Sequence, residues 1–176
     1  STNPAPARVA PAPIASRFGM DEPEWVLDDF DKGDASAWKA AGWANPAMLS
    51  TSNGMLKVEL MEGKSDKVAV GRSIRLDMSN RTRLMMDIVN NTSRSAQLAV
   101  AFIGGDASRY LETMSLAVKP GLNQNLTLDL TAKTFKSAES EWKHNSAFDN
   151  AQAVKQLFLL IYTRGTGEML IDNLRG

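Results

Sequence analysis

Residues able to carry nucleophilic or metal-assisted chemistry are scarce in this sequence. It contains no cysteine and a single histidine, His144. Cysteine nucleophiles, disulfides and zinc–thiolate sites are therefore excluded, and so are metal sites that need several histidines. A Ser-His-Asp triad would have to be built on His144. These absences leave the carboxylates as the main candidates for catalysis.

Carboxylates are numerous, with 20 Asp and Glu residues, but they stand in no catalytic motif. A glycosidase needs two carboxylates across a cleft, separated by ~5 Å or ~6.5–9.5 Å. Glu139 and Glu141 are close in sequence, but among so many acidic residues such pairs are expected by chance. The sequence also has no glycine-rich phosphate loop, no G-x-S-x-G elbow and no H-E-x-x-H motif. We therefore expect a protein that is not an enzyme.

Several aromatic and polar residues instead suit the binding of a sugar. Aromatic faces stack on the C–H groups of sugar rings, while amide, carboxylate and guanidinium groups hydrogen-bond the hydroxyls. Trp43 lies in the segment AGWANP, where the flanking glycine and proline favour exposure. Arg109, Tyr110 and Glu112 begin a strand after a Gly-Gly-Asp turn, and the parity of Tyr110 and Glu112 directs both to one face. Trp142, in the polar stretch SAESEWKHNSAFDN, is either an anchor into the core or a ligand platform. We take these five residues as candidate carbohydrate-binding side chains.

Other large side chains are expected to be structural. Trp25 stands beside the first strand, Trp38 is expected in the core, and Tyr162 ends an apolar strand. Met85 and Met86 are neighbours on one strand, so one of them must face away from the core. A sheet face lined by exposed methionines would indicate a protein partner.

The charges of the chain are balanced. Lysine and arginine number 20, as do aspartate and glutamate. This balance gives no electrostatic argument for binding nucleic acid or an anionic membrane. No apolar run approaches the ~18 residues that a membrane helix needs. We therefore expect neither a nucleic-acid partner nor membrane insertion.

Most of the sequence after Trp25 has the two-residue period of half-buried antiparallel strands. The alternation is clearest in residues 56–60, 74–78, 84–88 and 126–130. Three nearly continuous apolar runs, at residues 98–103, 157–162 and 169–174, are typical of central strands. Turn signals such as Asn53-Gly54 separate them. A single short helix is expected near residues 148–154, with Ser146 or Asp149 as its cap. About ten strands with at most one short helix predict an all-β protein, a two-sheet antiparallel β-sandwich.

Residues 1–24 differ from the rest, because prolines alternate there with alanines and small polar residues. Proline fixes φ and lacks an N–H, so this stretch is predicted to be an extended arm or linker before a β-sandwich domain at residues 25–176. It is either a solvated tether or an arm that docks on its own domain or on a neighbouring subunit. Such arms often follow a cleaved signal peptide, and the lack of cysteine is compatible with a bacterial periplasm or exterior. We expect a secreted or extracytoplasmic protein, of bacterial origin.

The two ends of the predicted domain carry recognisable motifs. The first is WVLDDFDKGDASAW at residues 25–38, and the second is VKQLFLLIYTRGTGEMLIDNLR at residues 154–175. Together they resemble the jelly-roll carbohydrate-binding modules of the galactose-binding-like superfamily, with family 11 as the nearest pattern. The middle of the chain matches only in the rhythm of its strands, and it lacks most of the tyrosines that family 11 modules carry on their concave sheet.

The resemblance also implies a structural calcium ion. In this family the first and last strands lie near each other and their junction commonly holds calcium, which takes six to eight oxygen ligands. Carried over to this sequence, the ligands would be Asp29, Asp31 and Asp172. The alternative is that these carboxylates are solvated at strand ends or cap turns.

Two functions remain open at this stage. The first is a non-catalytic, secreted carbohydrate-binding module that holds a polysaccharide on a concave sheet face. The second is a structural subunit of an extracellular assembly or surface layer, in which residues 1–24 contact neighbouring copies of the chain. Exposed, coplanar aromatic side chains on a concave sheet would favour the first function, and an arm lying on another copy would favour the second.

Overall fold

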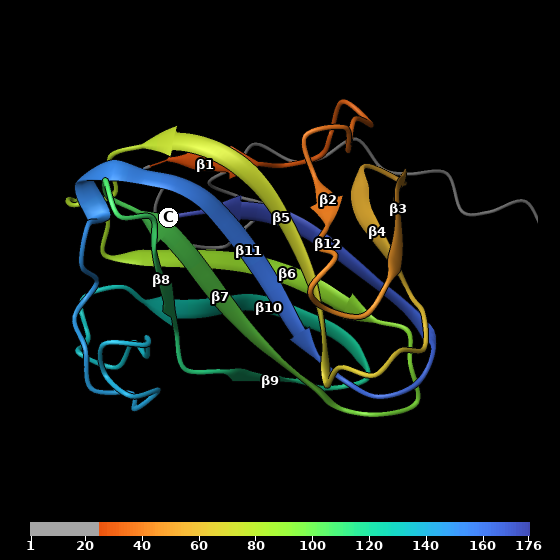
Figure 1. Cartoon of the computed structure of the whole chain (residues 1–176). Coiled ribbons are helices and arrows are strands. Elements are labelled where there is room, and N and C mark those ends of the chain that lie inside the picture. Colours follow the sequence, from red (N-terminus) through yellow and green to blue (C-terminus); the bar gives the residue numbers. More distant parts are fainter. Residues whose placement is uncertain (1–24) are drawn as a thin grey trace, which may run out of the picture.

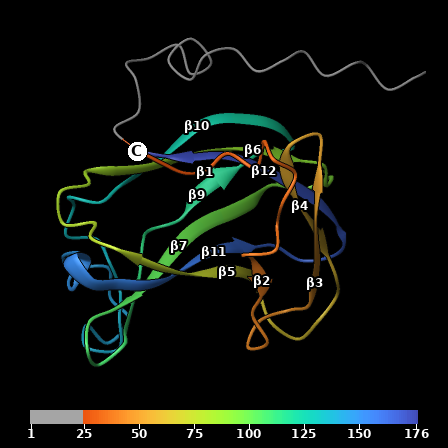
Figure 2. The same ribbon diagram turned by 90° about the horizontal axis from the view of Figure 1, so that it is seen from above.

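The computed structural model describes residues 25–176, and within them the chain forms two antiparallel β-sheets packed face to face (Figure 1). The prediction of an all-β sandwich is confirmed. The view from above shows the two layers, with β6, β10 and β12 in one and β5, β7 and β11 in the other (Figure 2). The strands are β1 (Val26–Asp28), β2 (Lys39–Ala40), β3 (Ala47–Ser52), β4 (Met55–Leu60), β5 (Lys67–Leu76), β6 (Arg83–Asn90), β7 (Ala96–Gly104), β8 (Arg109–Glu112), β9 (Leu116–Val118), β10 (Gly121–Asp129), β11 (Val154–Tyr162) and β12 (Gly167–Arg175).

The first sheet has the order β10-β6-β12-β4-β3, and β1 pairs with β12. Val26 is in register with Arg175, and Asp28 with Leu174. The two end motifs therefore meet as antiparallel neighbours, as the sequence predicted. The apolar run in β12 occupies the middle of this sheet, which explains why both of its faces are largely covered.

The second sheet has the order β2-β5-β11-β7-β8, and β9 pairs with β7. The other two apolar runs, in β7 and β11, form adjacent central strands of this sheet. All three runs are thus central strands, as predicted. The short strands β2 and β9 were not anticipated, because two or three residues are too few to show a period.

The core between the sheets is built from the inward-facing residues of each alternation. Leu56, Val58 and Leu60 of β4 are buried, while the lysine and glutamate between them are half-buried on the outer face. Met86 lies in this core, whereas Met85 is buried outside it, so the two neighbours do face opposite ways.

Two residues of the opening motif hold the edge of the sandwich together. Trp38 is buried, and its Nε1 donates a hydrogen bond of 3.0 Å to the Asp28 carboxylate. A guanidinium nitrogen of Arg72 lies 3.5 Å from the same carboxylate. Trp38 is therefore a structural residue, as expected. Trp25 is only partly buried and packs against the same core.

The predicted hairpin turn is present, whereas the predicted short helix is reduced and lacks the predicted cap. Asn53 and Gly54 both have positive φ, 51° and 69°, as a tight hairpin turn between β3 and β4 requires. The expected helix is reduced to one 3-10 turn, Ala151–Ala153. Neither Ser146 nor Asp149 caps it: Asn150 precedes the turn in a left-handed conformation and makes no side-chain capping bond. The predicted cap was wrong: the turn begins after Asn150 and is closed by a main-chain bond, in which Ala153 N donates to Asn150 O at 3.0 Å.

The prediction of an extended arm at residues 1–24 lies outside the described residues. In the part of the chain from Trp25 onward, no helix has the length and the apolar character needed to cross a membrane.

Candidate functional site

The outer face of the second sheet has a floor of small residues. In β11, Phe158 lies between Gly71 of β5 and Ala101 of β7, and Leu160 lies between an alanine of β5 and an alanine of β7. These outward residues form a small apolar cluster of their own, separate from the core between the sheets. A Cβ atom on Gly71 would lie 2.4 Å from the ring of Phe158. The missing side chain at Gly71 therefore allows the Phe158 ring to lie low on the sheet.

Trp43 stands over this floor from the segment after β2. Two main-chain bonds hold that segment along the edge of β5: Ala41 N donates to Ala69 O at 2.8 Å, and Asn45 N donates to Lys67 O at 2.9 Å. Between them, the Trp43 ring packs edge-on against Phe158, with a centroid distance of 5.4 Å and an interplanar angle of 68°. Trp43 is nevertheless 53% exposed. The predicted exposure of Trp43 is confirmed.

Trp142 approaches the same face from the long segment between β10 and β11. Phe135 and Phe148 fasten this segment by packing on each other and on Phe102 of the core, with centroid distances of 5.1, 6.4 and 4.6 Å. Trp142 itself is 54% exposed. Trp142 is therefore not an anchor into the core, a role that Phe135 and Phe148 take, and its role as a ligand platform stays a prediction.

The backbone at Trp142 is held in an uncommon conformation. Glu141 and Trp142 both have φ in the left-handed region, at 54° and 59°, which few residues other than glycine adopt. The N–H of Trp142 donates a hydrogen bond of 2.8 Å to Ser137 O, and the Ser140 hydroxyl donates to Lys143 O at 2.8 Å. The turn thus directs the indole outward at some conformational cost.

Tyr110 of β8 connects the two tryptophans. Its ring centroid lies 6.5 Å from that of Trp43 and 6.0 Å from that of Trp142, with interplanar angles of 84° and 62°. Tyr110 is also the neighbour of Ile103 across β7 and β8. Trp43, Tyr110 and Trp142 therefore form a continuous row across this face, which we call the aromatic row. The ring of Tyr110 is steeply inclined to both indoles, so the expectation of coplanar aromatic side chains was wrong.

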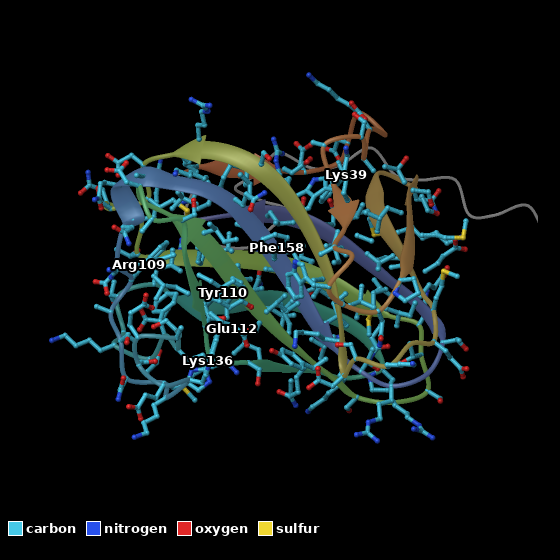
Figure 3. All side chains as sticks on the ribbon, in the orientation of Figure 1. Lys39, Arg109, Tyr110, Glu112, Lys136 and Phe158 are labelled. Atoms are coloured by element: carbon cyan, nitrogen blue, oxygen red, sulfur yellow. The ribbon has the colours of Figure 1, made fainter. Side chains whose placement is uncertain are left out.

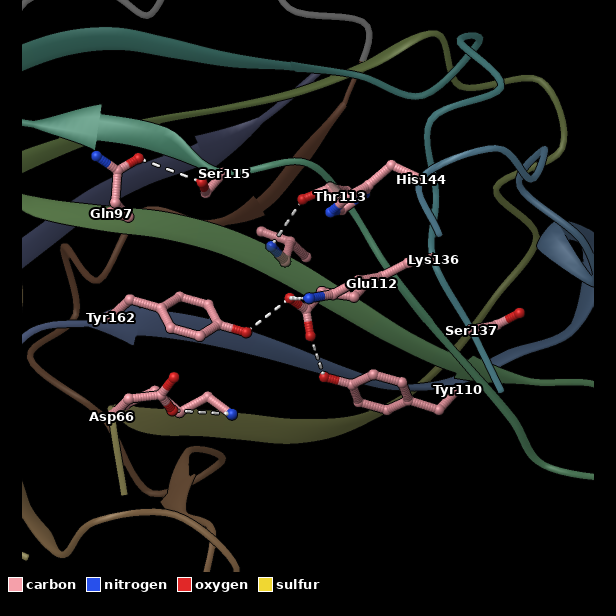
Figure 4. A network of polar contacts seen from close by, with 12 residues as sticks. Asp66, Gln97, Tyr110, Glu112, Thr113, Ser115, Lys136, Ser137, His144 and Tyr162 are labelled. Carbon is pink, nitrogen blue, oxygen red and sulfur yellow. Dashed lines mark hydrogen bonds and ion pairs between the residues drawn. The ribbon is translucent and has the colours of Figure 1, made fainter. Parts of the chain in front are cut away.

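Glu112 fixes the polar side of the site (Figure 4). The Tyr110 hydroxyl donates to Glu112 Oε1 at 2.7 Å, and the Tyr162 hydroxyl donates to Oε2 at 2.7 Å. Lys136 Nζ lies 3.3 Å from Oε2. Glu112 is only 4% exposed, so its charge depends on these partners for compensation.

The electrostatics keep both phenols protonated. Burial raises the pKa of Tyr110, and the hydrogen bond to the negative Glu112 raises it further. The pKa of Tyr162 is raised by the same two causes, in the same order. Each hydroxyl therefore donates its only proton to Glu112, and its oxygen lone pairs are left as acceptors for a ligand hydroxyl.

A recess of about 380 Å³ lies between these side chains. Its volume is near the lower end of the range for small-molecule pockets. Lys67 closes one side, with Nζ 5.0 Å from the centroid of the Tyr162 ring and 3.3 Å from the Asp66 carboxylate. The recess is lined by Trp43, Lys67, Ile103, Tyr110, Glu112, Lys136, Trp142 and Tyr162.

Four of the five predicted binding residues meet at this recess: Trp43, Tyr110, Glu112 and Trp142. The fifth, Arg109, does not line it; its Nε lies 3.7 Å from Glu139 Oε1 at the beginning of β8. Figure 3 shows Arg109 at the margin of the sheet, apart from Tyr110, Glu112 and Lys136. Strand alternation explains the separation, because Arg109 and Tyr110 are consecutive.

Four lining residues were not among the predicted ones: Lys67, Ile103, Lys136 and Tyr162. Lys67 and Lys136 carry no sequence signal, since their places follow from pairing across strands. Tyr162 was expected to be structural, but it belongs to the outward cluster of the second sheet. Its parity with Phe158 and Leu160 was a signal that could have placed it on the outer face.

The predicted calcium ligands lie near the junction of β1 and β12. Asp29 Oδ1 accepts a hydrogen bond from Asp31 N at 3.1 Å, and Asp172 Oδ1 accepts one from Asn173 N at 2.9 Å. Within residues 25–176 no group of three or more histidine, cysteine, aspartate or glutamate side chains is placed to hold a metal ion. The calcium ion stays a prediction.

A buried cation lies beside these carboxylates. Arg175 is 1% exposed, and its Nη1 lies 3.5 Å from Asp87 Oδ1 and donates to Asn173 O at 2.7 Å. Asp87 is in register with Asp172 on the neighbouring strand. The guanidinium therefore compensates negative charge at this end of the first sheet.

Comparison with known proteins identifies the fold. No family model matches the sequence, and no curated protein matches it. Among solved structures, a family 11 carbohydrate-binding module from Clostridium thermocellum, in complex with a β-1,3-1,4-mixed-linked tetrasaccharide, is 13% identical with a TM-score of 0.59, over 85% of this chain and 92% of that one. A family 28 module specific for non-crystalline cellulose is 12% identical with a TM-score of 0.63, over 86% of this chain and 93% of that one.

The same sandwich also occurs inside larger proteins. An agarase matches with 12% identity and a TM-score of 0.62, over 86% of this chain but only 24% of the agarase. The fold resemblance predicted from the two end motifs is thus confirmed for nearly the whole described domain. Identities this low show the fold, and the function must be argued from the site.

Proposed function

We propose that this chain is a non-catalytic carbohydrate-binding module that holds a polysaccharide on the outer face of its second sheet. The observation that carries the proposal is the aromatic row: two half-exposed tryptophans joined by a tyrosine over a floor of small residues. A soluble domain gains nothing in stability from exposing two indoles on one face. Exposed aromatic faces beside fixed polar groups are what a sugar ring requires.

Different polar groups supply the hydrogen-bond donors and the acceptors for a sugar. Lys136 uses one ammonium N–H toward Glu112 and retains others for a sugar hydroxyl. The phenol oxygens of Tyr110 and Tyr162 accept hydrogen bonds, because their own protons point to Glu112. Glu112 acts as a positioning residue that holds two acceptors and one donor in a fixed arrangement. Such preorganisation lowers the entropic cost of binding.

The structural comparisons support this proposal. The family 11 module with the same fold was solved with a tetrasaccharide bound, and the family 28 module is named for its cellulose specificity. The agarase contains the sandwich in about a quarter of its length. By analogy, this domain would hold a polysaccharide outside the cell for a catalytic partner.

The test is binding to a panel of soluble and insoluble polysaccharides, measured by affinity electrophoresis and by calorimetry. Trp43→Ala and Trp142→Ala are expected to weaken binding about tenfold or more each, a loss of about 1.4 kcal/mol per factor of ten. Leu122→Ala, at a 62% exposed side chain of β10 in the other sheet, is the matched control and should bind like the parent chain. Equal binding by all three variants would refute the proposed site.

A further inference from the structure

A second recess adjoins the aromatic row on the same outer face. It has a volume of about 1120 Å³, and Ile103 lines both recesses. Ile103 of β7 is in register with Tyr110 on one side and with Gln156 of β11 on the other. Tyr110 and Gln156 therefore lie two strand spacings apart, about 10 Å. A chain-like ligand stacked on the aromatic row can extend across Ile103 into the second recess.

The second recess differs from the first in its charge. It is lined by Arg75 of β5 and Lys155 of β11, both exposed, together with Ser73, Gln152 and Gln156. Arg75 makes no ion pair with any residue of the described domain. Lys155 Nζ makes one long contact, 3.5 Å to the Ser108 hydroxyl. Both cations are thus available to a ligand.

One acidic residue, Asp77, also lines this recess and keeps its negative charge, because its hydrogen-bond partner Ser79 is neutral. Asp77 Oδ1 accepts hydrogen bonds from Ser79 N at 2.9 Å and from the Ser79 hydroxyl at 2.5 Å. Arg72, which also borders the recess, is paired with Asp28 on the other side of the strand. In the first recess, Lys136 and Lys67 have their own counterions, Glu112 and Asp66.

A third cation stands at the edge of this face. Lys39 of β2 is exposed and in register with Gly71, and Figure 3 shows it near the end of β2, apart from Phe158. Arg75, Lys155 and Lys39 therefore give this face an excess of positive charge, in a chain whose net charge is zero. Such a local excess raises the concentration of an anionic ligand at the surface.

We propose that the polysaccharide held by this domain is acidic, with carboxylate or sulfate groups that contact Arg75 and Lys155 while an uncharged part of a ring stacks on the aromatic row. This inference rests on the proposed function and specifies the class of its ligand. A guanidinium binds carboxylate or sulfate through two parallel hydrogen bonds, and a lysine adds a point charge. Because both groups are exposed, their contribution is expected to fall as salt screens it.

The experiment compares charged and uncharged members of matched pairs. Polygalacturonate against its methyl ester tests carboxylate, and carrageenan against agarose tests sulfate. The charged member of at least one pair is expected to bind at least tenfold more tightly, and its affinity should fall at least tenfold between about 0.05 and about 0.5 M salt. The double variant Arg75→Gln/Lys155→Gln should abolish most of this preference.

The matched control is Arg94→Gln/Lys119→Gln, which removes the same two charges. Both residues are exposed, and they flank the stretch of β7 and β9 where Ala96 pairs with Val118, at the end of β7 opposite to Ile103. This control should retain the charge preference. Binding that is equal within each pair, or unaffected by salt and by the Arg75 and Lys155 substitutions, would overturn the acidic ligand. If such binding is still lost in Trp43→Ala, the proposed function stands. Failure to bind any polysaccharide of the full panel would overturn both.

Discussion

Glu112 and Lys136 are joined both through their main chains and through their side chains. Glu112 N donates to Lys136 O and Lys136 N donates to Glu112 O, each at 2.9 Å, and the side chains form an ion pair at 3.3 Å. This double connection fastens the segment that carries Trp142 to the strand that carries Tyr110. The position of one tryptophan of the aromatic row thus depends on a buried carboxylate.

Replacement of that carboxylate should affect stability and binding together. Glu112→Gln keeps the size of the side chain, but its amide nitrogen cannot accept a hydrogen bond from a phenol, and Lys136 loses its counterion. We expect the free energy of unfolding to fall by about 1–3 kcal/mol, and polysaccharide affinity to fall as well. Urea denaturation and calorimetry measure the two effects. Glu139→Gln, at an exposed surface ion pair, is the control and should change neither.

Substitution of Gly71 should displace the Phe158 ring, on which Trp43 packs. Gly71→Ala places a methyl group within 2.4 Å of the Phe158 ring. The ring must then move, which disturbs its edge-on contact with Trp43. We expect a loss of stability of about 1–3 kcal/mol from overpacking and weaker binding. Gly42→Ala is the control, because nothing lies within 4 Å of a Cβ there. Unchanged affinity in Gly71→Ala would show that the position of Phe158 does not matter to the ligand.

The two tyrosines predict a loss of stability in alkali. The chain has only two tyrosines, Tyr110 and Tyr162, and burial, followed by the bond to Glu112, raises the pKa of both above the ordinary value. The unfolded chain ionises near pH 10 and the folded chain only at higher pH. The stability that these groups contribute is therefore complete below pH 10 and declines as the pH rises above it.

Ultraviolet absorbance of tyrosinate gives a direct measurement, since every tyrosine reports on the site. The native protein should show little tyrosinate at pH 10.5, where the urea-denatured protein shows most of its signal. Titration of the native protein near pH 10 would contradict the hydrogen bonds to Glu112. The variant Glu112→Gln should shift the native titration toward the ordinary pKa.

Removal of calcium tests the predicted metal site. If Asp29, Asp31 and Asp172 hold calcium, a chelator should lower the melting temperature and added calcium should restore it. An ion present at 100 times its dissociation constant stabilises the folded state by about 2.7 kcal/mol. Asp172→Asn should remove the response. A melting temperature that does not change with chelator or with added calcium would contradict the predicted calcium site.

The sequence was informative where the signal is local. Two-residue alternation located the long strands, and the composition around Trp43, Tyr110 and Trp142 identified three residues of the aromatic row. Lys67, Lys136 and Tyr162 were missed, because register brings them to the site: Tyr162 is in register with Lys67, and Lys136 forms an isolated bridge with Glu112, which was predicted. Such pairs are separated by many residues, and alternation indicates which face a residue occupies but not which strand lies beside it.

The place of β12 in the first sheet has a consequence for how the chain becomes folded. Gly167–Arg175 pairs with β1, β4 and β6, so these strands have open edges until nearly the whole described chain has left the ribosome. Pairings so distant in sequence form slowly, and unpaired edges are prone to aggregation in the meantime. The first sheet can therefore be completed only late in synthesis, after β12 has emerged from the ribosome.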